Sequence, residues 1–232
     1  MIYAISDLHL DYTKDKDMNI FGENWQDYEE KIIEYWDVIS DDDLVLIAGD
    51  ISWAMKLEDA KIDLDRIDKL KGKKILLKGN HDYWWTSISK IKDLGFESLL
   101  FLQNNAFVTH GVKICGARGW IPRDYPEFDE HDEKIFLREL QRLELSLQSK
   151  VDGDYDEIIV MMHYPPFYRT NQPNEFEEIL KRYGVTKVIY GHIHGQHAFT
   201  MPEGLKNGIE YFCTSADKID FRPLLIRGNH EL

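Results

Sequence analysis

Cysteine is scarce in this sequence: Cys115 and Cys213 are the only two among 232 residues. They lie far apart, and each follows an apolar run typical of a strand, so we expect buried thiols and no disulfide. Neither has a second thiol at the spacing of a zinc finger. The scarcity of cysteine therefore argues against both a disulfide and a cysteine-based zinc site.

Long apolar runs are absent as well. No stretch of 18 or more apolar residues occurs, so the sequence predicts no transmembrane helix and no membrane partner. The first candidate metal ligand is already Asp7, which leaves no room for a signal peptide before the first predicted strand. We therefore expect a cytoplasmic protein.

Basic residues are few relative to acidic ones. The 28 lysines and arginines face 42 aspartates and glutamates, which gives a formal net charge of −14. Non-specific binding to nucleic acids and anionic membranes relies on clustered positive charge, so a nucleic-acid partner is not expected. A small phosphorylated substrate is compatible with this charge, because two bound divalent metals would make a pocket locally positive.

Internal repeats and linker segments are also lacking. Hydrophobic residues make up 43% of the sequence and aromatic residues 12%, as in soluble globular proteins. The candidate ligands span residues 7 to 194 and must meet in one place, so we expect residues 1–232 to form a single domain. The sequence leaves the oligomeric state open.

What the sequence does contain is a repeated pairing of an apolar run with polar side chains. The most pronounced run, Leu44–Ala48, leads into Gly49 and Asp50. Four further runs lead into Ser6–His9, Gly79–Asp82, His163 and Gly191–His194. Short apolar runs are typical of buried strands, and open α/β sheets bind ligands just beyond the carboxyl ends of their strands. One such ending is usually a turn or a helix cap, but five in order indicate a site.

Hydrophobic periodicity predicts an alternation of strands and helices. Helices are expected over residues 25–39, 56–70, 84–94, 131–148 and 174–183, and strands over 1–5, 44–48, 74–77, 98–102, 157–162 and 188–190, with a hairpin of 106–109 and 112–115. The early β-α-β-α-β order implies largely parallel strands. We expect residues 11–19 to form a solvated acidic loop at the edge of the site, and Asp41–Asp43 a solvated turn. The tail after His194 should hold short β-like segments and no helix.

The polar residues at the strand ends suit a metal centre. The candidate ligands are Asp7, His9, Asp50, Asn80, His163, His192 and His194. Asp7 and His9 are two residues apart, as are His192 and His194, so each pair points to one side of an extended segment. Seven donors are too many for one ion that keeps an open position, and two ions are implied. The alternative, unrelated turn caps and core histidines, does not account for the joint pattern.

A pair of dications held about 3.5–4 Å apart needs a carboxylate between the ions, and Asp50 is the natural bridge. Sites that mix imidazoles with carboxylates favour manganese, iron, cobalt, nickel or zinc over calcium or magnesium. We therefore expect two divalent transition metal ions as cofactors, manganese foremost. A metal-bridging hydroxide is the expected nucleophile.

The ordered motifs resemble the blocks of the calcineurin-like metallophosphoesterase superfamily. The matching blocks are Asp7-Leu8-His9, Gly49-Asp50, Gly79-Asn80-His81-Asp82, His163 and Gly191-His192-Ile193-His194. Each block is weak alone, but the ordered set is specific and covers most of the chain. The resemblance implies an α/β fold, a four-layer α/β/β/α sandwich with two mixed β-sheets flanked by helices and the active site at the strand ends.

The resemblance also implies a role for each residue by position. One metal would be held by Asp7, His9, Asp50 and His194, and the other by Asp50, Asn80, His163 and His192. His81 would contact the phosphate or protonate the leaving oxygen as the general acid, with Asp82 as its orienting partner. The alternative for His81 is a purely structural position beside the metals.

One departure from the superfamily pattern narrows the function. Its serine/threonine protein phosphatases continue Gly-Asp with two residues and then Asp-Arg-Gly. This chain instead continues Gly49-Asp50 with Ile51-Ser52-Trp53-Ala54-Met55. A protein phosphatase is therefore not expected, and the broad group of small bacterial-type phosphohydrolases remains.

Two arginines and several aromatic residues are candidates for selecting the substrate. Arg118 and Arg123 would each bind a phosphate or form a surface ion pair, and the ion pair is favoured for Arg123. The aromatic residues near the ligand turns are Trp53, Tyr83, Trp84, Trp120 and Tyr164. Arg118, Tyr164 and Trp84 are the expected substrate contacts, with core packing as the alternative for the rings.

Other motif-like residues are set aside. Gly228-Asn229-His230-Glu231 imitates the Gly79–Asp82 block, but it follows the last motif, out of order and at the end of the chain. His110, His131 and His197 lie off the motifs, and we expect surface or core positions for all three.

The sequence thus predicts a metal-dependent phosphoesterase. We expect a dimetal phosphohydrolase that cleaves a small substrate by in-line attack, phosphodiesters in preference to phosphomonoesters. A nuclease is disfavoured by the negative charge and the lack of a basic stripe. A non-catalytic metal-binding scaffold of the same fold is disfavoured because every ligand and His81 are present.

Overall fold

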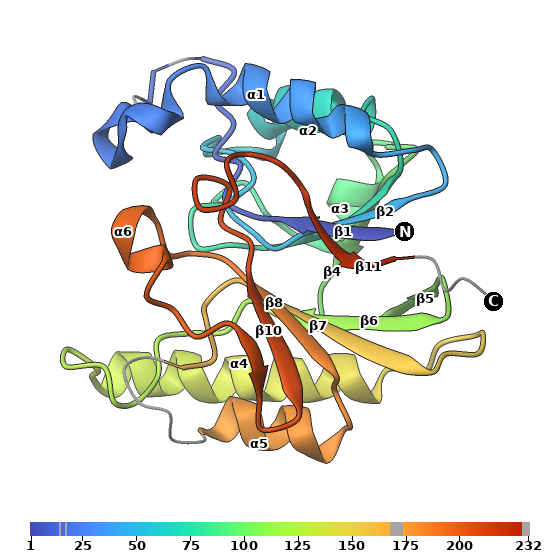
Figure 1. The fold of residues 1–232 in the computed structure, drawn as a ribbon, viewed down its shortest axis with the longest axis vertical. Helices are drawn as coiled ribbons and strands as arrows, with labels where there is room; N and C mark the ends of the chain where they lie inside the picture. Colours follow the sequence, from blue (N-terminus) through green and yellow to red (C-terminus); the bar gives the residue numbers. More distant parts are fainter. Residues whose placement is uncertain (14, 17, 168–173, 229–232) are drawn as a thin grey trace.

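The computed structural model describes residues 1–13, 15–16, 18–167 and 174–228. Two β-sheets lie face to face at its centre, with helices on both outer faces (Figure 1). The first sheet has the order β11 (Leu224–Arg227), β1 (Ile2–Ile5), β2 (Leu44–Ile47), β3 (Lys73–Leu77) and β4 (Leu99–Leu102). The second has the order β5 (Phe107–Thr109), β6 (Val112–Ala117), β7 (Glu157–Met162), β8 (Lys187–Tyr190), β10 (Ile209–Cys213) and β9 (Gly204–Lys206).

Both sheets are mixed. In the first, β1 to β4 are parallel and β11 runs antiparallel to β1. In the second, β6, β7, β8 and β10 are parallel, and β5 and β9 form antiparallel pairs with β6 and β10. The parallel strands of each sheet therefore end at a common edge, and the predicted ligand turns leave the strands there.

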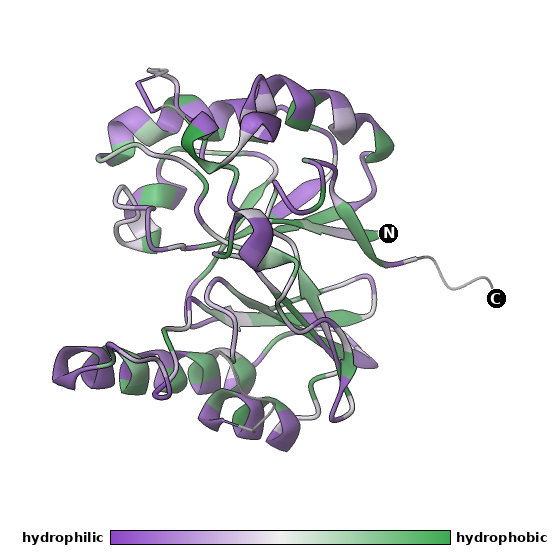
Figure 2. Ribbon diagram, turned by 60° about the vertical axis from the view of Figure 1, so that its left-hand side comes forward, coloured by the Kyte–Doolittle hydropathy of each residue, from purple (hydrophilic) through white to green (hydrophobic). Residues whose placement is uncertain are grey.

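The central strand β2 contributes to two cores because successive side chains point to opposite faces of a sheet. Leu44 and Leu46 of β2 pack between the two sheets, in a core that includes Met161. Val45 and Ile47 pack against the helices. With both faces covered, β2 is apolar at every position, as buried parallel strands are. Figure 2 shows the same division, with largely hydrophobic strands between helices that alternate in hydropathy.

Helices form the two outer layers and complete the predicted four-layer sandwich. The first sheet is covered by α1 (Tyr28–Tyr35), α2 (Leu57–Asp68) and α3 (Ile88–Lys92), and the second by α4 (Glu130–Gln148) and α5 (Glu175–Arg182). A capping box between Asp129 and Asp132 begins α4, which packs Phe136 and Leu143 on the sheet. Of the helices in the described ranges, none is both long and apolar enough to cross a membrane.

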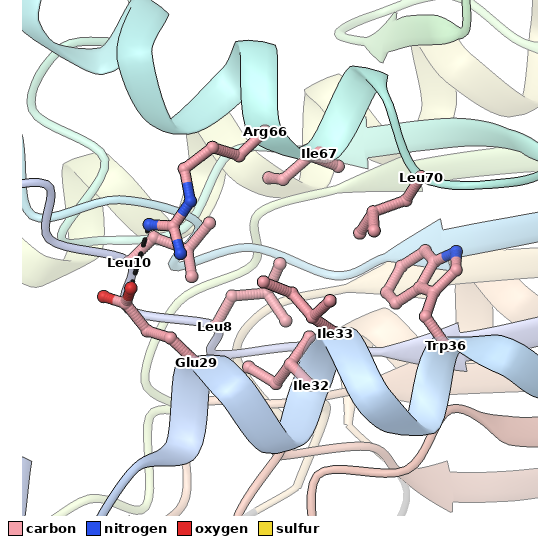
Figure 3. A pocket seen from close by; sticks show the side chains of 9 residues that line it. All are labelled: Leu8, Leu10, Glu29, Ile32, Ile33, Trp36, Arg66, Ile67 and Leu70. Carbon is pink, nitrogen blue, oxygen red and sulfur yellow. Dashed lines mark ion pairs between the residues drawn. The ribbon is translucent and has the colours of Figure 1, made fainter.

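The packing of α1 on α2 fixes the segment that follows β1. A small apolar hollow between the two helices is lined by Leu8, Leu10, Glu29, Ile32, Ile33, Trp36, Arg66, Ile67 and Leu70 (Figure 3). An ion pair of 2.8 Å between Arg66 and Glu29 spans the two helices at one end of the hollow. Leu8 and Leu10 flank His9, so this packing holds a predicted metal ligand in place.

Three predicted segments differ from the observed ones. In place of one helix over 25–39, α1 lies between the short 3-10 helices η2 (Glu23–Trp25) and η3 (Trp36–Val38). The helix predicted over 84–94 is reduced to α3, because the Trp84 indole and the Trp85 N–H both bond back to Asp82. The tail holds the expected strands but also a short helix, α6 (Gly195–Ala198).

Two acidic segments are less solvated than predicted. Asp11 is buried, and its carboxylate accepts hydrogen bonds from the N–H groups of Thr13, Asp15 and Lys16. Asp43 is also buried and accepts a hydrogen bond of 2.6 Å from the N-terminal ammonium group. The prediction of solvated acids is therefore wrong for these two residues, because each carboxylate holds a turn of backbone.

Candidate metal centre

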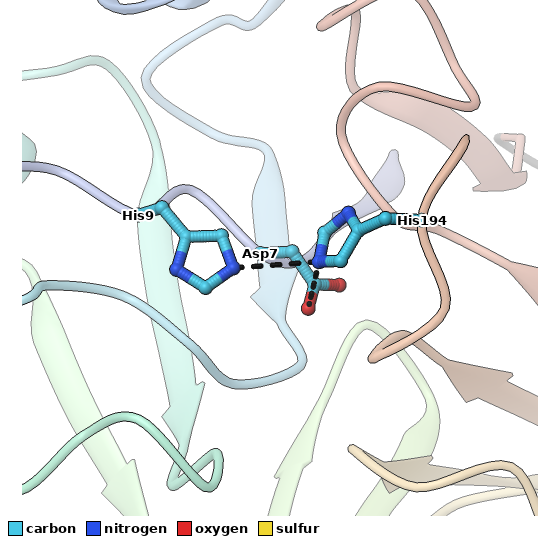
Figure 4. A group of neighbouring side chains, drawn as sticks. All are labelled: Asp7, His9 and His194. Atoms are coloured by element: carbon cyan, nitrogen blue, oxygen red, sulfur yellow. Dashed lines mark hydrogen bonds and ion pairs between the residues drawn. The ribbon is translucent and has the colours of Figure 1, made fainter. Parts of the chain in front are cut away.

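Asp7, His9 and His194 form the first of two groups of side chains that could hold a metal ion (Figure 4). Asp7 and His9 lie in the turn after β1, and His194 follows β8. The Nε2 atom of His194 lies 3.4 Å from Nε2 of His9 and 3.4 Å from Oδ1 of Asp7. The three donor atoms therefore converge on one point from both sheets.

Asp50, His163 and His192 form the second group, from the ends of β2, β7 and β8. Nε2 of His163 lies 3.3 Å from Oδ2 of Asp50. Asn80, which follows β3, belongs to the same place, since its Oδ1 lies 2.6 Å from Nε2 of His163. The structure thus brings all seven predicted ligands into two adjoining groups.

Asp50 lies between the two groups. Its Oδ2 faces His163 of the second group at 3.3 Å and Nε2 of His9 of the first group at 3.8 Å. Its other oxygen, Oδ1, accepts a hydrogen bond of 2.8 Å from the backbone N–H of His81. One carboxylate oxygen therefore faces both groups, as a bridge between two ions must.

Two histidines are held with Nε2 turned toward the site. Nδ1 of His163 lies 3.0 Å from the carbonyl oxygen of Ala48, and Nδ1 of His194 lies 3.0 Å from Oδ1 of Asp217. Because these partners are acceptors, Nδ1 of each ring carries the proton, and Nε2 of the neutral ring presents a lone pair. This is how metal-binding histidines are commonly oriented.

The electrostatics of the site favour a bound cation. Burial lowers the pKa of His9 to about 4 and that of His192 to about 3, so both rings are neutral at pH 7. Burial would also lower the pKa of His163 and His194, but the nearby carboxylates outweigh it and raise these pKa values to about 9 and about 10. Without a metal, Nε2 of His163 and Nε2 of His194 therefore carry protons at pH 7. A dication would compete with these protons, and its binding would release them.

Four of the candidate ligands have a backbone in the left-handed region. The φ angles are 58° at Asp7, 45° at His9, 51° at Asp50 and 73° at His192. Residues with a Cβ adopt this region rarely, at a cost of about 1–3 kcal/mol, and such residues cluster at functional sites. Each of these four side chains is therefore carried by a sharp turn that follows a strand.

His81 lies beside the two groups. Its ring centroid is 4.5 Å from that of Trp53 and 5.7 Å from that of His9. Burial lowers the pKa of His81, although the charge of Asp50 opposes this effect. Within the described residues its Nδ1 has no hydrogen-bond partner. Ring packing and the hydrogen bond from the backbone N–H of His81 to Asp50 thus hold the imidazole next to the candidate ligands.

Asp82 does not orient His81, and this part of the prediction is wrong. Its fully buried carboxylate accepts hydrogen bonds from the backbone N–H groups of Ile51, Ser52 and Gly79 and from the indole of Trp84. Across the described ranges, no hydrogen bond joins it to the His81 ring. Asp82 instead ties the turn after β2 to the turn after β3, which are the turns that carry Asp50 and Asn80.

The three residues predicted to contact the substrate differ in their position relative to the candidate ligands. The Trp84 ring is fully buried and bonds to Asp82, so its predicted contact with substrate is wrong. The ring centroid of Tyr164 lies 4.0 Å from that of His192, so this residue adjoins the site. Arg118 lies over the ring of Trp120, and its guanidinium faces Glu139 and contacts no candidate ligand among the described residues.

The residues set aside by the sequence analysis lie mostly as expected. Arg123 forms surface ion pairs with Glu133 and Glu175. The off-motif histidines, at positions 110, 131 and 197, are exposed. Both cysteines are buried and free. The imitation motif at the C-terminus lies outside the described residues beyond Gly228.

Asp217 is the functional residue that the sequence analysis misses. It is buried after β10, where Oδ1 lies 3.0 Å from Nδ1 of His194 and Oδ2 accepts a 2.7 Å hydrogen bond from the N–H of Gly195. No motif spacing links it to the ligand blocks. Its only sequence signal is a single acid after an apolar run, which usually marks a turn.

We expect Asp217→Asn to weaken the affinity of the first group for a metal ion by about 10–100-fold, the usual effect of removing a residue that orients a ligand. An asparagine leaves only one acceptor for the two N–H groups that Asp217 binds. Calorimetric titration with Mn²⁺ measures the change. Asp220→Asn, an exposed change in the same loop, is the control. Equal affinities in wild type and Asp217→Asn would contradict the orienting role.

The family model for calcineurin-like phosphoesterases matches residues 1–196. Among solved structures, the chain is similar to phosphopantetheinyl hydrolase from Mycobacterium tuberculosis, at 15% identity over 100% of this chain and 98% of that chain, with a TM-score of 0.51. A protein of unknown function from Aquifex aeolicus is 18% identical over 97% and 94%, with a TM-score of 0.50. A protein from Thermus thermophilus is 14% identical over 90% and 86%, with a TM-score of 0.55.

At these identities the structural likenesses show the fold alone. Among curated proteins, none matches the chain significantly.

Proposed function

The chain belongs to the calcineurin-like phosphoesterase family and is a metal-dependent hydrolase of phosphoester bonds, and we propose that its substrate is a small phosphodiester. The observation that carries this proposal is an aromatic wall around His81 and the candidate ligands. Such a wall offers contacts for the organic groups on either side of a diester, and a phosphomonoester has only one such group.

We assign the ligands of the two divalent ions as follows. Asp7, His9, Asp50 and His194 would hold one ion, and Asp50, Asn80, His163 and His192 the other. The donor set supports this assignment, because Asp50 Oδ2 faces a histidine of each group and two rings have Nδ1 fixed as a donor. A mixture of imidazoles and carboxylates suits transition metals, and we favour manganese.

The chemistry divides between the ions and the side chains. When bound, a pair of divalent ions supplies Lewis acidity, which activates water and offsets the charge on phosphoryl oxygens. His81 has the position of a general acid, because it lies beside both groups of candidate ligands and belongs to neither. In this role its imidazole gives a proton to the departing oxygen as the P–O bond breaks. Tyr164, packed on His192, walls the site next to the second group.

The aromatic wall comes from three separate segments. The Trp53 ring stacks on His9 at a centroid distance of 4.7 Å and lies 4.5 Å from that of His81. Tyr83 is 55% exposed and lies 6.1 Å from His81, and Phe21 is 42% exposed and lies 5.5 Å from His194. Exposed rings next to metal ligands can stack on an aryl group or a base. No such stacking is needed for inorganic phosphate.

Initial rates of the manganese-loaded protein on bis(p-nitrophenyl) phosphate and p-nitrophenyl phosphate test this proposal. We expect a kcat/KM at least about tenfold higher for the diester, a difference of about 1.4 kcal/mol in transition-state stabilisation. Tyr83→Ala should lower the diester rate more than the monoester rate. Preference for the monoester would overturn the substrate assignment, and no activity on either would overturn the assignment of small phosphoesters.

For His81→Gln we expect a loss that depends on the leaving group. Loss of a general acid typically costs about 10²–10⁴-fold in rate. The cost should be greatest for a diester with an alkyl alcohol as leaving group, and small for one that releases p-nitrophenolate, which departs without a proton. His110→Gln, an exposed change, is the control. Equal losses on both substrates would contradict the general-acid role.

Other expectations stay predictions. They are the single-domain organisation, the cytoplasmic location, the choice of manganese and the exclusion of nucleic acids as substrates. A nuclease assay on single-stranded and double-stranded DNA, run beside the chromogenic substrates, tests the last of these.

A further inference from the structure

A cluster of positive charge lies at the carboxyl ends of β3, β4 and β6. A small pocket there is lined by the polar residues Lys78, Gln103, Asn104, Arg118, Glu139 and Arg142. Lys78 follows β3 and directly precedes Gly79, and Arg118 follows β6. The same edge of the sheets carries the metal centre, so the pocket lies beside it.

Glu139 is the one acidic side chain among the residues that line this pocket. It is fully buried, and its Oε1 accepts a hydrogen bond of 2.8 Å from Arg142. The guanidinium groups of Arg118 and Arg138 lie 3.6 Å and 4.0 Å from the same oxygen. One carboxylate thus faces three arginines, with Lys78 beside them. In a chain with 42 acids and 28 bases, a local excess of positive charge is unexpected.

Two of these cations lack a close partner among the described residues. Arg118 is 16% exposed, and its Nε is buried without a hydrogen-bond partner among the described residues. Its 3.6 Å contact with Glu139 is too long for a hydrogen bond. Lys78 is partly buried, and within the described ranges its ammonium has neither a hydrogen bond nor an ion pair. A buried donor left unmet, as Nε of Arg118 is, costs free energy unless an acceptor binds there.

We propose that Lys78, Arg118 and Arg142 bind a phosphate-class oxyanion in this pocket. Guanidinium and ammonium groups match the oxygens of phosphate in charge and in donor geometry. Glu139 has a positioning role, since it holds the guanidinium of Arg142 by a hydrogen bond and lies next to that of Arg118. The small size of the pocket suits a single phosphate group.

The pocket is joined to the metal centre through the backbone. The carbonyl oxygen of Arg118 accepts hydrogen bonds from the N–H groups of His163 and Tyr164, at 3.0 Å and 2.9 Å. Lys78 is next to the turn that carries Asn80. The oxyanion is therefore either free phosphate or a second, non-reacting phosphate on the substrate of the proposed function. Both sources use the same chemistry, and the experiment separates them.

Calorimetric titration of the manganese-loaded protein with inorganic phosphate tests the pocket without requiring turnover. We expect two phosphates per chain in the wild type, one at the metals and one in the pocket, and one phosphate in Lys78→Met and Arg118→Met. Arg123→Met, which removes a surface arginine paired with Glu133, is the matched control and should bind two. One phosphate in the wild type, or the same stoichiometry in Lys78→Met, would overturn the proposal.

A thermal melt ensures that these variants report on binding. Lys78 has no hydrogen bond or ion pair to lose among the described residues. Lys78→Met should therefore melt at or above the wild-type temperature without phosphate, and phosphate should stabilise it less than it stabilises the wild type. Equal stabilisation of the two proteins by phosphate would count against the pocket.

Two dinucleotides separate the sources of the anion. If the pocket takes a second phosphate of the substrate, the KM of the wild type for pTpT should be about tenfold lower than that for TpT, and Lys78→Met should remove the difference. If it takes free phosphate, the two KM values should be equal while the second phosphate still binds in the titration. If neither dinucleotide is cleaved, the result counts against the proposed phosphodiester substrate. The number of phosphates bound in the titration would still show whether the pocket binds an oxyanion.

Discussion

Asp50→Asn is expected to lose both metal ions together and to lower phosphoesterase activity by about 10³-fold or more. The carboxylate Oδ2 faces Nε2 of His163 at 3.3 Å and Nε2 of His9 at 3.8 Å, one from each ligand group. An amide puts a neutral group between two dications, so their repulsion is no longer offset. Its oxygen can still accept the N–H of His81, so the turn itself should keep its shape.

Metal content after gel filtration, measured by mass spectrometry, and initial rates on bis(p-nitrophenyl) phosphate check this prediction. Asp7→Asn is the matched comparison. Asp7 belongs to the first group alone, so this variant should lose chiefly one ion while Asp50→Asn loses two. Two tightly bound ions and full activity in Asp50→Asn would refute the bridging role.

The layers of the fold could be predicted because the strand signal is strong here. A strand covered on both faces is apolar at every position, and Leu44–Ile47 and Ile159–Met162 are fully buried. The ends of helices were harder to predict, because side chains decide them. The helix over 84–94 fails in its first turn, where Trp84 and Trp85 bond to Asp82. Such hydrogen bonds cannot be predicted from the periodicity of apolar residues.

The candidate ligands could be predicted because each ends an apolar run and because two pairs share a two-residue spacing. The residues that orient these candidate ligands could not be predicted from the sequence. Asp217 follows a different strand from the histidine that it orients, and only the folded chain brings them together. The sequence suggests Asp82 as a partner of its neighbour His81, yet its carboxylate accepts hydrogen bonds from its own turn and from the turn after β2. The predicted role of Asp82, to orient His81, was wrong because it relied only on their proximity in sequence.

The geometry of the ligand turns is a further feature outside the reach of sequence patterns. A left-handed backbone is usual for glycine, but at this site it occurs at Asp7, His9, Asp50 and His192. The tertiary structure imposes this strain by packing the turns closely against one another. At Gly79, whose backbone is not left-handed, glycine is needed for a different reason, which is to let one turn approach another.

Gly79→Ala is therefore expected to be among the most damaging single changes in the molecule. A Cβ at this position would lie 2.1 Å from Oδ1 of Asp50 and 2.2 Å from its backbone nitrogen. The nitrogen belongs to the backbone, and the buried Oδ1 is held by the backbone N–H of His81, so the two turns would have to separate. We expect the free energy of unfolding to fall by about 3 kcal/mol, which for a chain of this size lowers Tm by about 6–12 °C.

The same displacement separates Asp50 from Asn80, because Gly79 lies between the end of β3 and that ligand. Metal content should therefore fall even at temperatures where the variant is folded, and added Mn²⁺ should raise its Tm less than it raises that of the wild type. Gly228→Ala is the control, since a Cβ there meets no atom within 4 Å. If Gly79→Ala bound two ions with wild-type affinity, close contact between these turns would not be what holds Asp50 in place.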